Sequence, residues 1–295
     1  MQHGAASMTA MRIPALLALF LLTLAVRAAG AGLFDYDKNT PLDIREIGVE
    51  KRGDVTVRDI TFVGTKDPIK AYLVTPAQSG PHAAILYVHW FGDPKTTNRT
   101  QFLSEAVALA HRGVVSLCID TMWSQRGWWR GRKPETDLAG GVNQVIELRR
   151  ALDLLLAQPG VDAARVAMVA HDFGAMFGAV AGAADQRPKA YVFLAPTPRL
   201  SDWYLYNVKP ADVDAYKKEL LPLDPIHAVG ALAPAPVFYQ FATKDEHVPA
   251  PRPQEFYDAT KARKLLGTYE AGHDLTPSEV AADRVAWLAK ELGLK

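Results

Sequence analysis

Three polar residues, each placed just after an apolar run, have the types and spacing needed for hydrolysis through a covalent intermediate. Asp172 follows a short apolar run and stands two residues before Gly174, at the start of a segment rich in Ala and Gly. This is the pattern of a strand, a tight turn and a helix that together expose a nucleophile. Asp245 and His273 each follow a later apolar run. A nucleophile, an acid and a histidine in this order can attack a substrate and then activate water.

Aspartate stands at a position where such turns commonly hold serine. A free carboxyl group has a pKa of about 3.9, so Asp172 needs no base to become a nucleophile. Attack on an sp3 carbon of an epoxide or a halide would give an alkyl ester of Asp172, which water held by His273 could hydrolyse. Attack on an ester carbonyl mostly reverts, because the carboxylate is the better leaving group. A direct alternative is that Asp172 and His273 together activate water.

The elements that must position these residues alternate between strand and helix patterns. Residues 54–64 and 69–77 favour an antiparallel pair of strands. Continuous apolar runs typical of buried parallel strands lie at 83–90, 114–120, 165–171, 189–196, 235–242 and 265–271. Helical patterns lie at 101–113 and 140–160, after Gly174, near 253–262, and at 278–292. The sequence therefore predicts one α/β domain with a mostly parallel central sheet and helices on both faces.

These motifs resemble the α/β-hydrolase superfamily over nearly the whole chain after residue 31, most of all its dienelactone-hydrolase-like and esterase branch. The resemblance rests on LYVHWFGDP, AHDFGA, TKDEHVP and AGHDL. It implies Asp172 as nucleophile, Asp245 as acid and His273 as base. It also implies an oxyanion hole formed by the backbone N–H of Phe173 and an N–H near Trp90. The aspartate in an HD-aromatic-G string departs from that branch and is instead the pattern of epoxide hydrolases and haloalkane dehalogenases.

Other histidines and acids near these motifs are rival candidates. His247 is a rival base and Glu246 a rival acid, but His273 fits the order of nucleophile, acid and histidine better. We expect His89 to make a structural hydrogen bond to loop backbone and His171 to point into the protein interior. No cluster of His, Cys and carboxylates has metal-ligand spacing, so neither a metal nor another cofactor is expected.

Two segments that interrupt the alternation are expected to lie beyond the carboxyl ends of the strands, where ligands of open α/β sheets bind. Residues 122–138 predict a loop rich in tryptophan, and residues 199–230 predict a short lid. The lid tyrosines are candidates to protonate an epoxide oxygen. The substrate pocket is expected to draw on Trp123, Trp203, Tyr204 and Tyr206.

The composition restricts the cellular setting and the partners. Residues 1–31 carry a basic residue, an apolar core and an Ala-x-Ala pattern, which predicts a cleaved signal peptide and a secreted or periplasmic protein. The remaining residues, 32–295, form the predicted domain. A net charge of +1 gives no electrostatic footprint for nucleic acid. The single cysteine, Cys118, cannot form an intramolecular disulfide. The expected partner is a small-molecule substrate, with no membrane association after cleavage.

The sequence thus predicts a hydrolase that uses an Asp172–His273–Asp245 triad on a small, mostly apolar substrate through a covalent ester. Two alternatives stay open. One is hydrolysis of esters or lactones, as in the dienelactone hydrolases. The other is a protein of this fold whose site is disabled and which only binds a ligand or partner.

Overall fold

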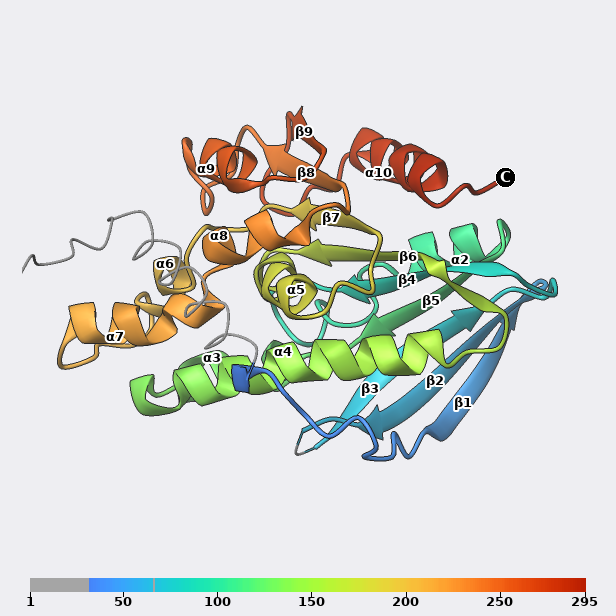
Figure 1. The fold of residues 1–295 in the computed structure, drawn as a ribbon, viewed down its shortest axis with the longest axis horizontal. Helices are drawn as coiled ribbons and strands as arrows, with labels where there is room; N and C mark the ends of the chain where they lie inside the picture. Colours follow the sequence, from blue (N-terminus) through green and yellow to red (C-terminus); the bar gives the residue numbers. More distant parts are fainter. Residues whose placement is uncertain (1–31, 66) are drawn as a thin grey trace, which may run out of the picture.

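One large sheet organises the molecule (Figure 1). The computed structural model describes residues 32–65 and 67–295, so the predicted signal peptide lies outside the described residues. The strands of the sheet are β1 (Arg45–Arg52), β2 (Val55–Val63), β3 (Pro68–Thr75), β4 (His82–Val88), β5 (Val114–Ile119), β6 (Val161–His171), β7 (Ala190–Leu194), β8 (Val237–Ala242) and β9 (Lys264–Tyr269).

The strands are arranged in the order β1-β2-β3-β5-β4-β6-β7-β8-β9. The pairs β1–β2, β2–β3 and β3–β5 are antiparallel, and every pair from β5 to β9 is parallel. The parallel strands β4 and β5 are buried at every position, as their continuous apolar runs predict. The predicted antiparallel pair and the predicted mostly parallel sheet are both confirmed.

Helices cover both faces of the sheet. They are α2 (Leu103–Ala110), α3 (Trp128–Gly131), α4 (Pro134–Leu156), α5 (Phe173–Ala184), α6 (Ser201–Tyr204), α7 (Val213–Leu220), α8 (Pro225–Ala228), α9 (Arg252–Ala259) and α10 (Ser278–Glu291). Short 3-10 turns lie at Met122–Ser124, Leu221–Leu223 and Val229–Leu232. Helices α4 and α5 pack together on one face. On the other face α2 and α10 are joined by the ion pair between Glu105 and Arg284.

Two segments differ from the sequence-based expectation. Strand β1 was not predicted, because it is exposed on both faces and so lacks the alternation that burial of one face produces. The predicted loop 122–138 is wrong in part: it contains α3, and α4 begins within it at Pro134, a residue well suited to the first turn of a helix. Residues 199–230 hold α6, α7 and α8, and Figure 1 shows α3, α6 and α7 grouped beyond the ends of the central strands.

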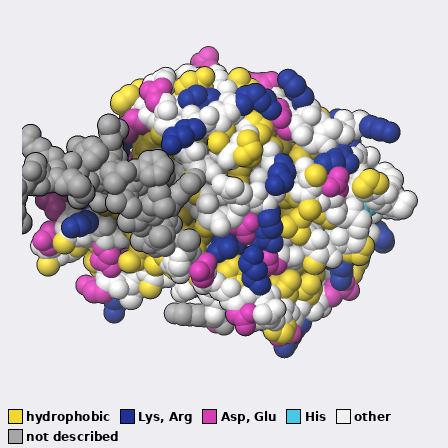
Figure 2. Space-filling view, in the orientation of Figure 1, with side chains coloured by type: hydrophobic (Ala, Val, Ile, Leu, Met, Phe, Trp, Pro, Cys, Tyr) yellow, Lys and Arg dark blue, Asp and Glu magenta, His cyan; other side chains and the backbone are white. Residues whose placement is uncertain are grey.

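The surface and the helices give two further observations. On the face seen in Figure 2, Lys and Arg side chains are interspersed with Asp, Glu and hydrophobic ones over much of the area. Across residues 32–65 and 67–295, no helix has both the length and the apolar character needed to cross a membrane.

The topology brings the three candidate catalytic segments to one edge. Asp172 follows β6, Asp245 lies shortly after β8, and His273 lies shortly after β9. Strands β6, β7, β8 and β9 are parallel neighbours, so their carboxyl ends share one edge of the sheet. The residues that come directly after these strands are therefore held close together by a rigid scaffold.

Candidate active site

The turn that carries Asp172 has a strained backbone. Strand β6 ends at His171 and helix α5 begins at Phe173, with Asp172 between them at φ +52° and ψ −116°. A positive φ is uncommon for a residue with a side chain and is usually retained where the surrounding structure enforces it. Here the Asp172 N–H donates to the carbonyl of Leu194, the last residue of β7, at 2.8 Å. The turn directs the side chain away from the sheet, toward the loop after β4.

Gly174 allows helix α5 to approach the end of β4. A Cβ atom at this position would lie 2.5 Å from the carbonyl oxygen of Val88 and 2.7 Å from that of His89. Both are backbone atoms that could move aside only by displacing the loop, so glycine is required here. The close approach brings the loop after β4 to the Asp172 side chain.

The structure brings Asp172, Asp245 and His273 together. The His273 Nδ1 atom lies 2.8 Å from Asp245 Oδ2, and its Nε2 atom lies 3.7 Å from Asp172 Oδ1. Asp172 is 1% exposed and His273 is 9% exposed. The imidazole thus lies between two carboxylates, one that orients it and one that faces its other nitrogen.

The rival residues do not form the carboxylate pairs, although the His247 ring lies edge-on to His273 with centroids 5.1 Å apart. His247 and Glu246 are both exposed, and the backbone N–H of His247, not its ring, donates to Asp245 Oδ1 at 2.8 Å. The Val248 N–H donates to the same oxygen at 2.9 Å. These two amides hold the Asp245 carboxylate so that its second oxygen faces His273.

The loop after β4 supplies a backbone donor to Asp172, but from a different residue than expected. The Phe91 N–H donates to Asp172 Oδ2 at 3.1 Å. The Trp90 N–H donates instead to the side-chain oxygen of Gln101 at 2.9 Å. The expected donor near Trp90 is therefore the amide of the next residue. The Phe173 N–H remains the second predicted donor, at the N-terminus of α5.

Trp90 and the neighbouring histidines hold the loop in place. The Trp90 ring stacks on His171 with their centroids 5.2 Å apart. His171 is fully buried, as expected, with its ring nitrogens 2.7 Å from Gln101 Nε2 and 2.9 Å from the carbonyl oxygen of His273. His89 Nδ1 lies 2.7 Å from the carbonyl oxygen of Trp90, which confirms the predicted structural role of His89. Gln101 was missed in the sequence because it lies outside the motifs, seven residues after the end of LYVHWFGDP.

Three buried polar atoms at this site make no hydrogen bond to a described residue, although two of them face each other at 3.7 Å. They are Asp172 Oδ1, His273 Nε2 and the indole nitrogen of Trp203. The Trp203 ring centroid lies 6.1 Å from that of His273 and 5.7 Å from that of Phe173. Buried polar groups are almost always hydrogen-bonded, so such a group is unusual and calls for an explanation. These atoms are therefore available to a molecule bound at the site.

The four residues expected to line the substrate pocket occupy different environments. Trp203 lies beside His273. Tyr206 is 81% exposed, which contradicts a place for it within the pocket. Trp123 is buried, donates its indole N–H to the carbonyl of Trp90 at 3.1 Å and packs in the core, so it supports the loop. Tyr204 is buried with its ring centroid 3.4 Å from the guanidinium carbon of Arg132.

An aromatic cluster surrounds Phe173, and it includes Phe91, to which sequence reasoning gave no role in the pocket. Phe91 lies edge-on to Phe173 with ring centroids 5.5 Å apart, and Trp128 and Trp129 make similar edge contacts at 6.0 and 6.1 Å. Trp203 approaches the same ring. These rings make the surroundings of Asp172 apolar and restrict water, which strengthens electrostatic interactions within the site.

The two carboxylates control the charge of His273. Burial alone would lower the pKa of this histidine, but its interactions with Asp172 and Asp245 outweigh burial and raise the pKa to about 10. Burial also disfavours the charged form of Asp245, which for a carboxyl means a higher pKa. The hydrogen bond from His273 nevertheless holds the pKa of Asp245 below its usual value. At neutral pH His273 is therefore protonated, and it lies between the side chains of Asp172 and Asp245. Protonation of His273 stabilises the folded protein. This contribution is complete below about pH 6.5, the pKa of histidine in the unfolded chain, and it is lost as pH rises through about 10.

Removing the charge of Asp172 should lower the pKa of His273. In Asp172→Asn we expect the pKa to fall by about 1 to 3 pH units, because one of two carboxylates that favour the cation is gone. The pH dependence of the His273 ring nitrogen resonances in 15N NMR measures this directly. The matched control is Asp258→Asn, which changes an exposed carboxylate on α9. A titration midpoint that is the same in Asp172→Asn and in the unaltered protein would contradict the coupling.

Comparisons with known proteins identify the fold. No protein-family model matches the chain, and no curated protein matches it in sequence. Solved structures do: the acetyl xylan esterase from Paenibacillus sp. R4 has a TM-score of 0.71 at 17% identity, over 91% of this chain and 93% of that one. Acetyl xylan esterase 1 from Thermoanaerobacterium sp. JW/SL YS485 has a TM-score of 0.71 at 15% identity, over 90% and 93%. An S-formylglutathione hydrolase from Agrobacterium tumefaciens has a TM-score of 0.66 at 15% identity, over 84% and 100%. At such low identity these likenesses show the α/β-hydrolase fold alone.

Proposed function

We propose that this chain is a hydrolase that cleaves a bond at an sp3 carbon through a covalent ester on Asp172. One observation carries the proposal: the Asp172 Oδ1 atom is buried, lacks a partner among the described residues, and lies 3.7 Å from His273 Nε2. A carboxylate oxygen that accepts no hydrogen bond keeps its lone pairs available for attack, even though His273 faces it as an ion-pair partner. The other oxygen accepts the Phe91 N–H, which would stabilise charge on it when water later attacks the ester.

The charge state of His273 supports a two-step order. While Asp172 is ionised, the raised pKa keeps His273 protonated, so it cannot act as a base. Formation of the ester neutralises Asp172 and removes one of the two groups that hold the proton. The pKa of His273 then falls, the proton can leave, and Nε2 can accept a proton from the attacking water. The nucleophilic step thus prepares the base for the hydrolytic step, which argues against direct activation of water by the free enzyme.

The donors around the site favour a leaving group that needs no proton, such as a halide. In an in-line displacement the leaving group departs on the side away from the Asp172 oxygen, so His273 Nε2, which faces that oxygen, is not placed to protonate it. An epoxide oxygen would need an acid there, but Tyr206 is exposed and burial raises the pKa of Tyr204, which makes it a weaker acid. The unpartnered indole N–H of Trp203 can stabilise a halide by a hydrogen bond without giving up a proton.

Replacing Trp203 with phenylalanine tests this role for its indole N–H. We expect Trp203→Phe to lower kcat/KM for a bromoalkane by roughly tenfold, because one hydrogen bond to a developing anion is lost while an aromatic ring remains. Trp287→Phe, which alters an indole on α10 packed against Phe238, serves as the matched control. Equal rates of bromide release from Trp203→Phe and the unaltered enzyme would remove Trp203 from the reaction.

A substrate panel tests the proposed reaction class. Short bromoalkanes, terminal epoxides and p-nitrophenyl acetate are each incubated with the enzyme, and the products are followed with time. We expect bromide and alcohol from the bromoalkanes at a rate above that for the epoxides. Catalytic hydrolysis of the acetate alone would overturn the proposal in favour of ester chemistry. Failure to turn over any of the three classes would favour a binding protein with a disabled site.

A further inference from the structure

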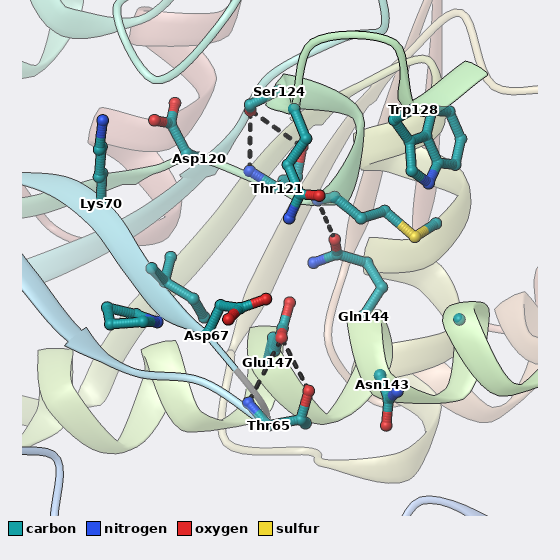
Figure 3. Close-up of a pocket in the computed structure, with 15 residues that line it drawn as sticks. Thr65, Asp67, Lys70, Asp120, Thr121, Ser124, Trp128, Asn143, Gln144 and Glu147 are labelled. Carbon is teal, nitrogen blue, oxygen red and sulfur yellow. Dashed lines mark hydrogen bonds between the residues drawn. The ribbon is translucent and has the colours of Figure 1, made fainter. Parts of the chain in front are cut away.

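A second polar hollow lies next to the aromatic cluster but apart from Asp172 and His273. It has a volume of about 440 Å³ and lies between the start of β3, the turn after β5 and one side of α4 (Figure 3). Trp128 forms part of its wall, and the same indole contacts Phe91 and Phe173 in the aromatic cluster. Trp128 therefore belongs both to the lining of the hollow and to the aromatic cluster around Phe173.

A buried amide in this hollow lacks a partner for its N–H groups. Gln144 is 1% exposed, and its Oε1 atom accepts the backbone N–H of Met122 at 2.7 Å. That hydrogen bond fixes the orientation of the amide, because the NH2 group could not accept from Met122. The Nε2 atom has no hydrogen-bond partner among the described residues. Figure 3 shows this nitrogen directed into the hollow, on the side of Glu147.

Acceptor groups face the same space. Glu147 Oε1 accepts the hydroxyl of Thr65 at 2.9 Å and its backbone N–H at 3.3 Å. Asp67 lies beside Glu147, and Asp120 lies farther along the wall (Figure 3). Asp120 Oδ1 accepts the backbone N–H of Arg99 at 3.0 Å. The described lining thus combines one unsatisfied buried donor and the ammonium group of Lys70 with several carboxylate oxygens.

This combination selects among the possible ligand classes. An ammonium group offers only donors, so it would leave the Gln144 N–H unsatisfied. An anion offers acceptors, but the three carboxylates of the lining would repel it more strongly than the single cation, Lys70, would attract it. A hydroxyl group both donates and accepts, and adjacent hydroxyls could pair with an amide and a carboxylate at the same time. An aromatic wall such as Trp128 suits the apolar C–H face of such a molecule.

We propose that this hollow binds a neutral polyhydroxylated ligand, namely a saccharide unit, with Gln144 as donor and Glu147 as acceptor. The site is distinct from the Asp172 site and does not depend on the proposed reaction. Its test is accordingly a binding measurement on the full chain, which succeeds or fails whether or not the enzyme turns over a halide.

The probes are D-glucose and maltose, with propylammonium and acetate as ligands of the competing classes. Saturation-transfer NMR detects binding, and titration gives the dissociation constant. We expect saturable binding of at least one sugar, and none of propylammonium or acetate. Gln144→Met keeps the length of the side chain but removes both its N–H groups and the oxygen that accepts from Met122, and it should weaken sugar binding by about tenfold. Gln254→Met, on the exposed face of α9, should leave sugar binding unchanged.

A second variant keeps the proposal open to refutation if Gln144→Met fails to fold. Glu147→Gln keeps an oxygen that can accept from Thr65 but loses the charge, and it should also weaken sugar binding. Three results would overturn the proposal: saturable binding of propylammonium or acetate in place of sugar, no saturable binding of either sugar, or the same sugar affinity in Glu147→Gln as in the unaltered protein.

Discussion

Asp172→Asn is expected to lower turnover by about four orders of magnitude or more, the scale seen when the nucleophile of a catalytic triad is removed. An amide oxygen or nitrogen is a poor nucleophile, so the covalent ester cannot form. The side chain keeps nearly the same size, and its oxygen can still accept the Phe91 N–H, so the fold should be retained. Steady-state product release measures the loss, and circular dichroism checks the fold.

The size of this effect separates the covalent reaction from weaker roles of the carboxylate. The control is Asp258→Asn, which removes a carboxylate exposed on α9 and should not alter turnover. If Asp172→Asn kept a tenth or more of the original rate while folded, Asp172 would not be the nucleophile. Deamidation of the introduced asparagine back to aspartate is excluded by mass spectrometry of the same sample.

His273→Gln is expected to trap the covalent intermediate. Alkylation of Asp172 needs only its ionised carboxylate, whereas hydrolysis of the ester needs a base beside it. The variant should therefore release one equivalent of leaving group rapidly and then stop. Intact-mass spectrometry should show the added mass of the alkyl group, and peptide mapping should place it on Asp172.

A serine-type order of events predicts a different outcome for the same variant. If His273 had to remove a proton in the first step, the substitution would prevent the first bond from forming and no adduct would accumulate. The double variant with Asp172→Asn should show no added mass. An unmodified His273→Gln enzyme, tested with a substrate that the unaltered enzyme turns over, would exclude the two-step order.

The sequence predicted the scaffold of the site because the scaffold depends on local patterns. The apolar runs before Asp172, Asp245 and His273 become β6, β8 and β9, and parallel strands place the residues after them at one edge. The structure brings the three side chains together there. This part could be foreseen, since both the runs and the residue order are visible along the chain.

Other parts of the site depend on contacts between distant segments and could not be predicted. The Trp90 amide is engaged by Gln101, which lies on a segment that carries no motif. Helix α6 is short and directs Trp203 toward His273. Tyr206, two residues after the end of this helix, is exposed. Spacing alone does not show which face of so short a helix will be buried. Gln144 likewise follows the ordinary pattern of a buried helix position and is distinguished only by its unpaired nitrogen.

The central claim is that an oxygen of Asp172 enters the product, and isotope transfer measures this directly. Excess enzyme is allowed a single turnover in water labelled with 18O, and the product and the peptide that contains Asp172 are weighed by mass spectrometry. Water attacks the carbonyl carbon of the ester, so the first alcohol released should carry unlabelled oxygen while Asp172 gains 18O. A first product that carries 18O, together with an unlabelled Asp172, would contradict the covalent account and establish direct attack by water.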